Sequence, residues 1–220
     1  MHRLLSFGLA AIVLVLASCG ETKEDPIQDL TYHYQPLEIG NFWIYSVDET
    51  IYFGENDSEE NQYFLRDRIR TSYLNVEDEL VYIVERSTSS DQSSWVKNLE
   101  YTLQVKKQSL IRTIENQSLV TLVFPPKVGQ IWNGKIYQGE GEDDFEIASI
   151  QGEVLRVDQE EMDDEVTFRD VRFEVFTKEV GLSEKYDEVI TYCSRNDCLG
   201  DKLIDGGYKR HLLLETYGKN

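Results

Sequence analysis

The side chains able to support covalent or metal chemistry are few in this chain, with three cysteines and three histidines among 220 residues. Cys193 and Cys198 enclose the short segment Cys-Ser-Arg-Asn-Asp-Cys. Two cysteines at this spacing favour a disulfide in an oxidising compartment. Free thiols are one alternative. A metal site with His211 as a third ligand is the other, although a structural zinc site takes four ligands and no convincing fourth lies nearby.

Motifs typical of enzymes are missing. The sequence contains no nucleophile elbow, no His-Glu-x-x-His motif and no glycine-rich phosphate loop. Two of the 41 acidic residues could act together in glycoside hydrolysis, but the sequence does not select a pair. Asp143-Asp144 and Asp163-Asp164 could bind calcium, although neither follows the EF-hand spacing and solvated hairpin turns are the default interpretation. We therefore expect no catalytic residues, no cofactor and no metal.

Tryptophan is the remaining residue type that could contact a ligand, by stacking on a sugar or lining an apolar pocket. Trp43 and Trp132 stand in similar local sequences, and we expect them in the core. Trp95 is flanked by Ser93, Ser94 and Lys97, which indicates an exposed position. Trp95 is therefore the candidate ligand-binding residue.

The third cysteine, Cys19, follows a segment that directs export. Arg3, an apolar stretch from Leu4 to Ala17, and the small residue Ser18 have the layout of a secretory signal. The stretch is shorter than the roughly 20 residues that a transmembrane helix needs, and an ordinary signal would not require the cysteine. The run resembles a bacterial lipobox. The resemblance implies cleavage before Cys19, lipidation with palmitate-like chains and anchoring in a membrane.

Residues 19–33 are polar and are predicted to form a lipidated tether between the signal peptide (1–18) and a single β domain (34–220). Lys23-Glu24-Asp25 resembles the short tag that follows the lipidated cysteine in surface lipoproteins of Bacteroidota. Gly20 is not the aspartate associated with retention in the inner membrane. We expect a lipid-anchored protein of the outer membrane, facing either the periplasm or the cell surface.

The charge balance limits the partners. With 41 acidic and 22 basic residues the net charge is −19, and removal of residues 1–18 takes away Arg3 and no acidic residue. Such a chain repels nucleic-acid phosphates and anionic lipid headgroups. We expect no nucleic acid and no basic membrane patch. The expected partners are the membrane, through the N-terminal lipid, and a protein or glycan, while the oligomeric state is not indicated.

From residue 34 onward the pattern predicts an all-β fold. Tyrosine and phenylalanine are frequent, with 13 and 9 copies, and both favour strands. Tyr101, Leu103 and Val105 share one strand face, and Val171, Phe173 and Val175 share another. We predict an antiparallel meander forming a strongly curved sheet or barrel, lipocalin-like or lipoprotein-carrier-like, with a sandwich as the alternative. Helix signals are poor, and at most one short helix is expected, around Asp201–Asp205.

An internal echo joins two distant segments. Residues 36–43 and 125–132 both read Pro-x-x-(Ile/Val)-Gly-x-x-Trp, a tight turn leading into a strand, in which glycine permits a positive φ. The echo indicates either a duplication or a recurring device at strand starts. The opening Pro-Leu-x-x-Gly-Asn-x-Trp-x-Tyr, residues 36–45, resembles that of a family of Bacteroidota outer-membrane or surface lipoproteins whose function is not known.

These features favour a non-enzymatic binding or structural module at the cell envelope. One alternative is a carrier that holds an apolar ligand in a β-barrel cavity, and the other is a glycan-active enzyme using two carboxylates. An apolar cavity of about 300 Å³ or more would favour the carrier. Two carboxylates about 5–10 Å apart in a groove would favour the enzyme. A filled interior would favour the binding or structural module.

Overall fold

The fold is built from successive antiparallel hairpins, and the structure is a computed structural model that describes residues 32–55, 57–139, 141 and 143–220. The expected signal peptide, Cys19 and nearly all of the tether lie outside these residues. The elements in chain order are η2 (Tyr32–Tyr34), β1 (Asn41–Gly54), β2 (Asp57–Leu74), β3 (Leu80–Ser89), β4 (Val96–Lys106), β5 (Ser109–Ile114), β6 (Gln117–Val123), β7 (Ile131–Asn133), β8 (Asp144–Gln151), β9 (Val154–Asp163), β10 (Phe168–Thr177), β11 (Gly181–Tyr192) and β12 (Ile204–Lys219).

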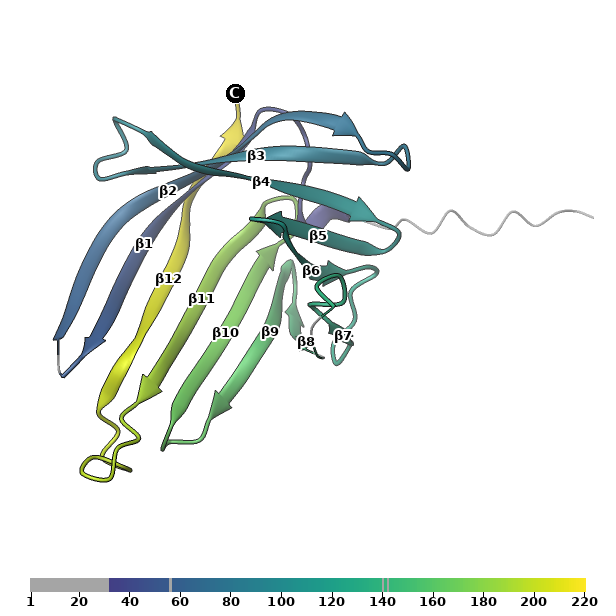
Figure 1. Cartoon of the computed structure of the whole chain (residues 1–220). Coiled ribbons are helices and arrows are strands. Elements are labelled where there is room, and N and C mark those ends of the chain that lie inside the picture. The colour runs from purple at the N-terminus through teal and green to yellow at the C-terminus, as the bar shows by residue number, and fades with distance from the viewer. Residues whose placement is uncertain (1–31, 56, 140, 142) are drawn as a thin grey trace, which may run out of the picture.

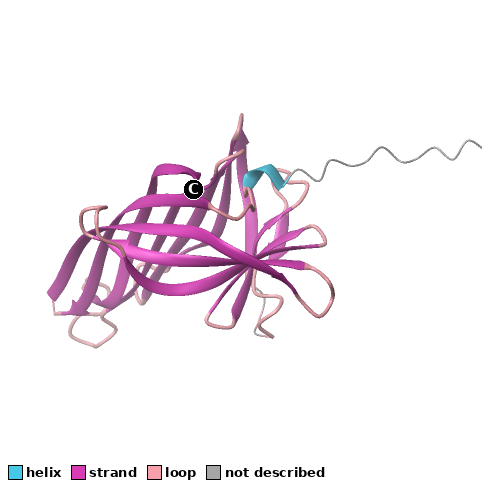
Figure 2. Ribbon diagram, turned by 90° about the horizontal axis from the view of Figure 1, so that it is seen from above, coloured by secondary structure: helices cyan, strands magenta, loops and turns pink. Residues whose placement is uncertain are grey.

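All twelve described strands belong to one sheet in the order β6-β5-β4-β3-β2-β1-β12-β11-β10-β9-β8-β7. The sheet rolls up until its two edge strands meet (Figures 1 and 2). The Val120 amide of β6 donates to the Gly134 carbonyl at 2.8 Å, and the Trp132 indole of β7 donates to the Val120 carbonyl at 2.8 Å. The predicted antiparallel, strongly curved sheet is confirmed as a nearly closed barrel, and the sandwich alternative is wrong.

Bulges and tight turns explain the curvature. The pairing of β1 with β12 shifts register between Ile44 and Tyr45, and a bulge of this kind bends and twists a strand. The β5–β6 hairpin turns through Glu115 and Asn116, which both have positive φ. This conformation matches the twist of the flanking strands. The long strands β1, β2 and β9–β12 continue beyond the closed part as an open, curved sheet (Figure 1).

The closed part of the barrel is filled by apolar side chains from nearly every strand. Ile69, Val84, Leu122, Ile147 and Val157 are completely buried there. Burying a side chain of this size stabilises the fold by about 1.5–3 kcal/mol. One small cavity, of about 10 Å³, is described inside this core, which is room for about one water molecule.

The sequence echo corresponds to the same local structure in two places. Gly40 and Gly129 have φ of 94° and 78°, as expected for the turn. Each glycine amide donates a hydrogen bond to an isoleucine carbonyl. Gly40 donates to Ile69 of β2 at 2.9 Å, and Gly129 donates to Ile147 of β8 at 2.8 Å. The first turn leads into β1 and the second into β7. The echo therefore marks the first strand of each six-strand half of the sheet.

The chain enters the barrel at one end of β11. The Glu179 amide, in the β10–β11 turn, donates to the His33 carbonyl. The segment between β11 and β12 lies at the opposite end of β11, which spans 12 residues or roughly 40 Å. The helix expected around Asp201–Asp205 is wrong, because Ile204 already pairs with Tyr192 in the sheet. The open part of the sheet thus extends away from the end where the chain enters.

Candidate functional site

The inner face of the sheet carries charged side chains where it leaves the apolar core. Asp67 of β2 accepts two hydrogen bonds from Arg86 of β3, from Nε at 2.8 Å and from Nη2 at 2.7 Å. The Tyr101 hydroxyl of β4 donates to the same carboxylate at 2.9 Å. Burial, followed by the charge of Asp67, raises the pKa of Tyr101. The hydroxyl therefore stays protonated and acts as a donor.

A second buried ion cluster lies on the opposite wall. Glu174 of β10 is fully buried and pairs with Arg112 of β5. The Lys185 ammonium of β11 lies 3.0 Å from Glu174 and 3.3 Å from Asp187. Burial raises the pKa of Glu174, but the charges and hydrogen bonds of Arg112 and Lys185 outweigh burial and lower this pKa to about 2. Glu174 is ionised at neutral pH.

The charges continue as a row across the open part of the sheet. Register pairs Glu160 with Arg172, Arg172 with Asp187, Asp187 with Arg210 and Arg210 with Glu49. Residues directly opposite in antiparallel strands lie on the same face, so acidic and basic side chains alternate over five neighbouring strands. Arg210 Nε donates to Glu49 at 2.6 Å. The inner face of the open sheet is therefore charged but internally balanced.

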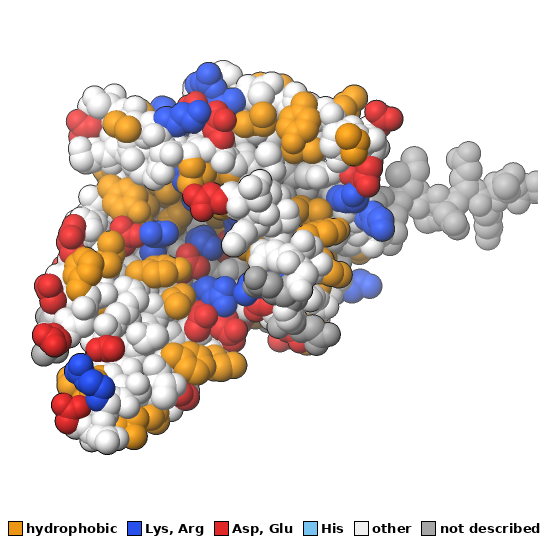
Figure 3. Space-filling view, viewed as in Figure 1, with side chains coloured by type: hydrophobic (Ala, Val, Ile, Leu, Met, Phe, Trp, Pro, Cys, Tyr) orange, Lys and Arg blue, Asp and Glu red, His pale blue; other side chains and the backbone are white. Residues whose placement is uncertain are grey.

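Four of these charged side chains line a cleft of about 150 Å³ between β2–β4 and β11–β12, namely Arg86, Lys185, Asp187 and Arg210. Basic, acidic and hydrophobic side chains mix in the hollowed centre of this face (Figure 3). A wider, open hollow of about 470 Å³ adjoins the cleft along Tyr63, Thr88 and Asn98. The lining residues of the cleft are Tyr63, Leu65, Arg86, Thr88, Asn98, Leu99, Lys185, Asp187, Arg210 and Leu212.

The charged side chains that line the cleft are mostly basic, and two of the carboxylates that pair with them are buried. Arg86, Lys185 and Arg210 line it, and Asp187 is the one carboxylate among its lining residues. Asp67 and Glu174, the partners of two of these cations, are 2% and 0% exposed. Arginine and lysine offer only donors. The cleft therefore suits a ligand that accepts hydrogen bonds.

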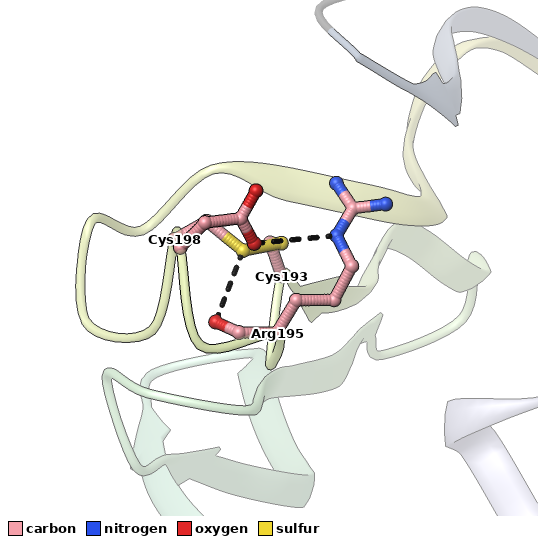
Figure 4. Close-up of a disulfide and its surroundings, with 4 residues drawn as sticks. Cys193, Arg195 and Cys198 are labelled. Atoms are coloured by element: carbon pink, nitrogen blue, oxygen red, sulfur yellow. Dashed lines mark hydrogen bonds and ion pairs between the residues drawn. A yellow bond between two sulfur atoms is a disulfide. The ribbon is translucent and has the colours of Figure 1, made fainter.

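The cysteine pair of the sequence forms a disulfide. Cys193 and Cys198 are joined with their Cα atoms 5.9 Å apart, in the β11–β12 connection (Figure 4). The Cys198 amide donates a hydrogen bond to the Arg195 carbonyl at 3.1 Å. The alternative metal site is wrong, because these thiols are oxidised and His211 lies in β12, where its Nε2 is 2.8 Å from Glu184.

The predicted ligand residue Trp95 lies apart from the cleft. Its ring packs under the Arg66 guanidinium, with 4.4 Å from Cζ to the ring centroid, and its indole nitrogen donates to the Gln92 carbonyl at 3.1 Å. Arg66 lies on the outer face of β2, since its neighbours Leu65 and Asp67 point inward. Trp95 is therefore half-buried on the outer face, less exposed than its sequence context indicates.

The other two tryptophans pack in or against the core of the barrel. Trp43 is 3% exposed, as expected of a core residue. Trp132 is half-buried, contacts the Phe145 ring edge-on at 6.1 Å between centroids, and helps to join β7 to β6.

Three of the four aspartates considered for calcium form hydrogen bonds or ion pairs within the chain. Asp164 accepts hydrogen bonds from the amides of Val166, Thr167 and Phe168 and so shapes its own turn. Asp163 pairs with Arg169 at 2.8 Å, and Asp143 pairs with Lys135 at 2.9 Å. Within residues 32–220, apart from positions 56, 140 and 142, no three His, Cys, Asp or Glu side chains lie together as a metal site would require.

Comparisons with known proteins give no family. No protein-family model matches the chain, and no curated protein matches it. A solved structure of a protein assigned as exported, with a YmcC-like fold, from Bacteroides fragilis is 8% identical with a TM-score of 0.43, over 84% of this chain and 98% of that one. A protein assigned as a lipoprotein from Parabacteroides distasonis is 9% identical with a TM-score of 0.43, over 87% and 100%. These likenesses do not bear on what this chain binds. Among the described residues, no helix has the length and apolar character to span a membrane.

Proposed function

We propose that this chain is a lipid-anchored, non-enzymatic binding module of the bacterial cell envelope and that the cleft between β2–β4 and β11–β12 is its ligand site. Anchoring at Cys19 and residence in the outer membrane rest on the lipobox and the tag that follows it. The open sheet extends away from the end where the chain enters the barrel, so the cleft would be presented away from the anchor.

The observation that carries this proposal is the contrast between a filled barrel and an open, polar cleft. A carrier of an apolar ligand needs an enclosed apolar cavity, typically about 300 Å³ or more. The cavity within the described core measures about 10 Å³. The adjoining hollow of about 470 Å³ reaches the size of a ligand site, but it is open rather than enclosed, and every described lining residue except Val96 carries a hydroxyl or amide group.

The chemistry of the lining favours a glycan as the ligand. Thr88, Ser89, Ser90, Ser94 and Asn98 supply hydroxyl and amide groups that can both donate and accept hydrogen bonds. The Tyr63 ring, shared by the cleft and the hollow, provides a flat surface of the kind that stacks on sugars. Glycosidase chemistry usually needs two carboxylates, and Asp187 is the one carboxylate in the described lining.

A filling substitution tests the proposal. Thr88→Trp places a large ring where the cleft and the hollow join, whereas Thr50→Trp places the same ring on β1, on the opposite face from Glu49. We expect the full-length lipoprotein in detergent to bind members of a glycan panel, with affinity lowered at least about tenfold by Thr88→Trp and unchanged by Thr50→Trp.

Four outcomes would contradict the proposal. They are equal binding by both variants, binding of peptides but of no glycan, release of shortened glycans during incubation, and extraction of an apolar ligand bound one-to-one. The last two would indicate the enzyme and the carrier. A melting temperature within a few degrees of the wild type for each variant ensures that lost binding is not lost folding.

A further inference from the structure

The outer face of β2 carries a row of three arginines. Arg66, Arg68 and Arg70 occupy alternate positions of the strand and therefore point to the same side. Across the sheet, Arg66 lies opposite Ile44 and Arg68 opposite Phe42. On the other side Arg68 lies opposite Glu85. Three cations in a row are unexpected in a chain with a net charge of −19.

Two of these arginines differ from every other arginine in the described part of the chain. The remaining eight each have a carboxylate within 4 Å, at distances up to 3.9 Å. Arg70 is among them through Glu85. Arg66 and Arg68 form no such pair, although acidic residues outnumber basic ones almost two to one. Chance pairing in so acidic a chain should have supplied partners.

The two unpaired arginines also leave hydrogen bonds unmade. The Nε atoms of Arg66 and Arg68 are buried and have no hydrogen-bond partner. Burial of such donors without a partner is unfavourable, and polar groups in this state call for a ligand or another explanation. Desolvation, together with the positive charge of neighbouring Arg68, lowers the pKa of Arg66, and an anion bound beside the two guanidinium groups would offset the repulsion between their charges.

The Trp95 ring packs against the Arg66 guanidinium. The ring centroid lies 4.4 Å from the Arg66 guanidinium carbon, so the guanidinium stacks on the indole. A stacked guanidinium loses little freedom when it forms hydrogen bonds at its edge. Glu85 is the carboxylate that faces this row from β3, and it lies 3.9 Å from Arg70.

We propose that Arg66 and Arg68, supported by Trp95, form a binding site for a phosphate group on the outer face of β2 and β3. Two guanidinium forks supply planar, bidentate donors, and a phosphate monoester with a charge of about −1.5 to −2 matches two arginines better than a carboxylate does. The site lies on the opposite face of the sheet from the cleft and does not depend on the proposed function. The phosphate could belong to a soluble sugar phosphate or to a lipid.

The matched control is Arg156. It also stacks on an aromatic ring, with its guanidinium carbon 3.7 Å from the Phe173 centroid, but its Nε pairs with Asp158 at 2.6 Å. Arg156→Gln therefore removes an arginine that also stacks on an aromatic ring, but one whose guanidinium is already paired with the carboxylate of Asp158. The double variant Arg66→Gln/Arg68→Gln removes the proposed site.

The test follows the arginine Nε–H signals of the full-length protein in detergent by nuclear magnetic resonance. The probes are inorganic phosphate, glucose 6-phosphate, short-chain phosphatidic acid and, for comparison, acetate. We expect saturable shifts of the Arg66 and Arg68 signals with a dissociation constant of about 1 mM or lower for a phosphate probe. Affinity should fall at least about tenfold in the double variant and stay within about twofold in Arg156→Gln.

The pattern across probes identifies the source of the phosphate, because binding of phosphatidic acid alone assigns a lipid and binding of glucose 6-phosphate assigns a soluble ligand. Equal binding of acetate and phosphate, no saturation below about 10 mM, or equal losses in the double variant and Arg156→Gln would each overturn the proposal. Phosphate should also raise the melting temperature of the wild type and not of the double variant. A merely structural role for the two arginines would not produce that difference.

Discussion

Glu174→Gln removes one negative charge from the barrel interior while keeping the size of the side chain. Glu174 is 0% exposed, and its loss leaves Arg112, with a side chain 10% exposed, without a carboxylate. Breaking one partner out of a buried ion pair costs about 3–5 kcal/mol. The lowering of the Glu174 pKa from 4.5 to about 2 corresponds to about 3 kcal/mol. Both arguments predict that Glu174→Gln lowers the free energy of unfolding by about 3 kcal/mol at pH 7.

The same pKa fixes how the loss depends on pH. The Glu174 pKa is depressed in the folded chain, so its carboxylate stabilises the fold fully above about pH 5, and this contribution disappears as the pH falls through about 2. Protonated Glu174 resembles glutamine. The difference between wild type and variant should therefore shrink to roughly 1–2 kcal/mol at pH 3 and vanish below pH 2.

Urea unfolding followed by tryptophan fluorescence at pH 7, 4 and 3 measures these differences directly. Glu161→Gln, at an exposed position of β9, is the matched control, and we expect it to change the free energy of unfolding by less than about 0.5 kcal/mol. A loss below about 1 kcal/mol for Glu174→Gln at pH 7, or a loss that does not shrink with falling pH, would refute the reasoning. The first result would mean that the cluster is solvated, and the second that its effect is steric.

Three further predictions concern the anchor, the disulfide and the two glycine turns. Cys19→Ala should move the protein from the membrane fraction to the soluble fraction, and retention in the membrane would contradict lipidation. Cys193→Ser/Cys198→Ser should lower the free energy of unfolding by about 2 kcal/mol, which a urea titration of the wild type with reductant should reproduce. Gly129→Ala meets no atom within 4 Å and should cost about 1 kcal/mol through its positive φ. Gly40→Ala would place its Cβ 2.6 Å from a backbone carbonyl and should cost clearly more, as measured by calorimetry.

Local sequence predicts the parts of this fold that depend on neighbouring residues. The aromatic and β-branched strands, the short acidic turns and the glycines with positive φ at Gly40 and Gly129 all follow from propensity and turn chemistry. The rolled shape of the sheet follows as well, because a long meander with a buried face closes to protect its edges. The short helix near Asp201–Asp205 fails because pairing with β11 outweighs weak local preference.

The clearest failure of local pattern is β10. Val171, Phe173 and Val175 alternate as a buried face would, yet the buried positions of this strand are Glu174 and Phe176. Glu174 can be buried because Arg112, which is 62 residues away in sequence, reaches it from β5. On the outer face Phe173 is covered by the stacked Tyr186 ring at 5.3 Å. The orientation of the strand is decided by partners that no window around β10 contains.

A weaker signal for the charged inner face does exist, because opposite charges recur at alternate positions on neighbouring strands. Arg172 and Glu174 share one face of β10, and Lys185 and Asp187 share one face of β11, with register pairing Arg172 to Asp187 and Glu174 to Lys185. On a face fully exposed to water, neighbouring charges are screened and need not be opposite in sign. Here the charges are opposite both along each strand and between strands. This pattern indicates a face that is partly removed from water, where neighbouring like charges would be costly. On the outer face of β2, by contrast, Arg66, Arg68 and Arg70 repeat one sign along the strand, and this repetition supports the proposal that they bind an anion.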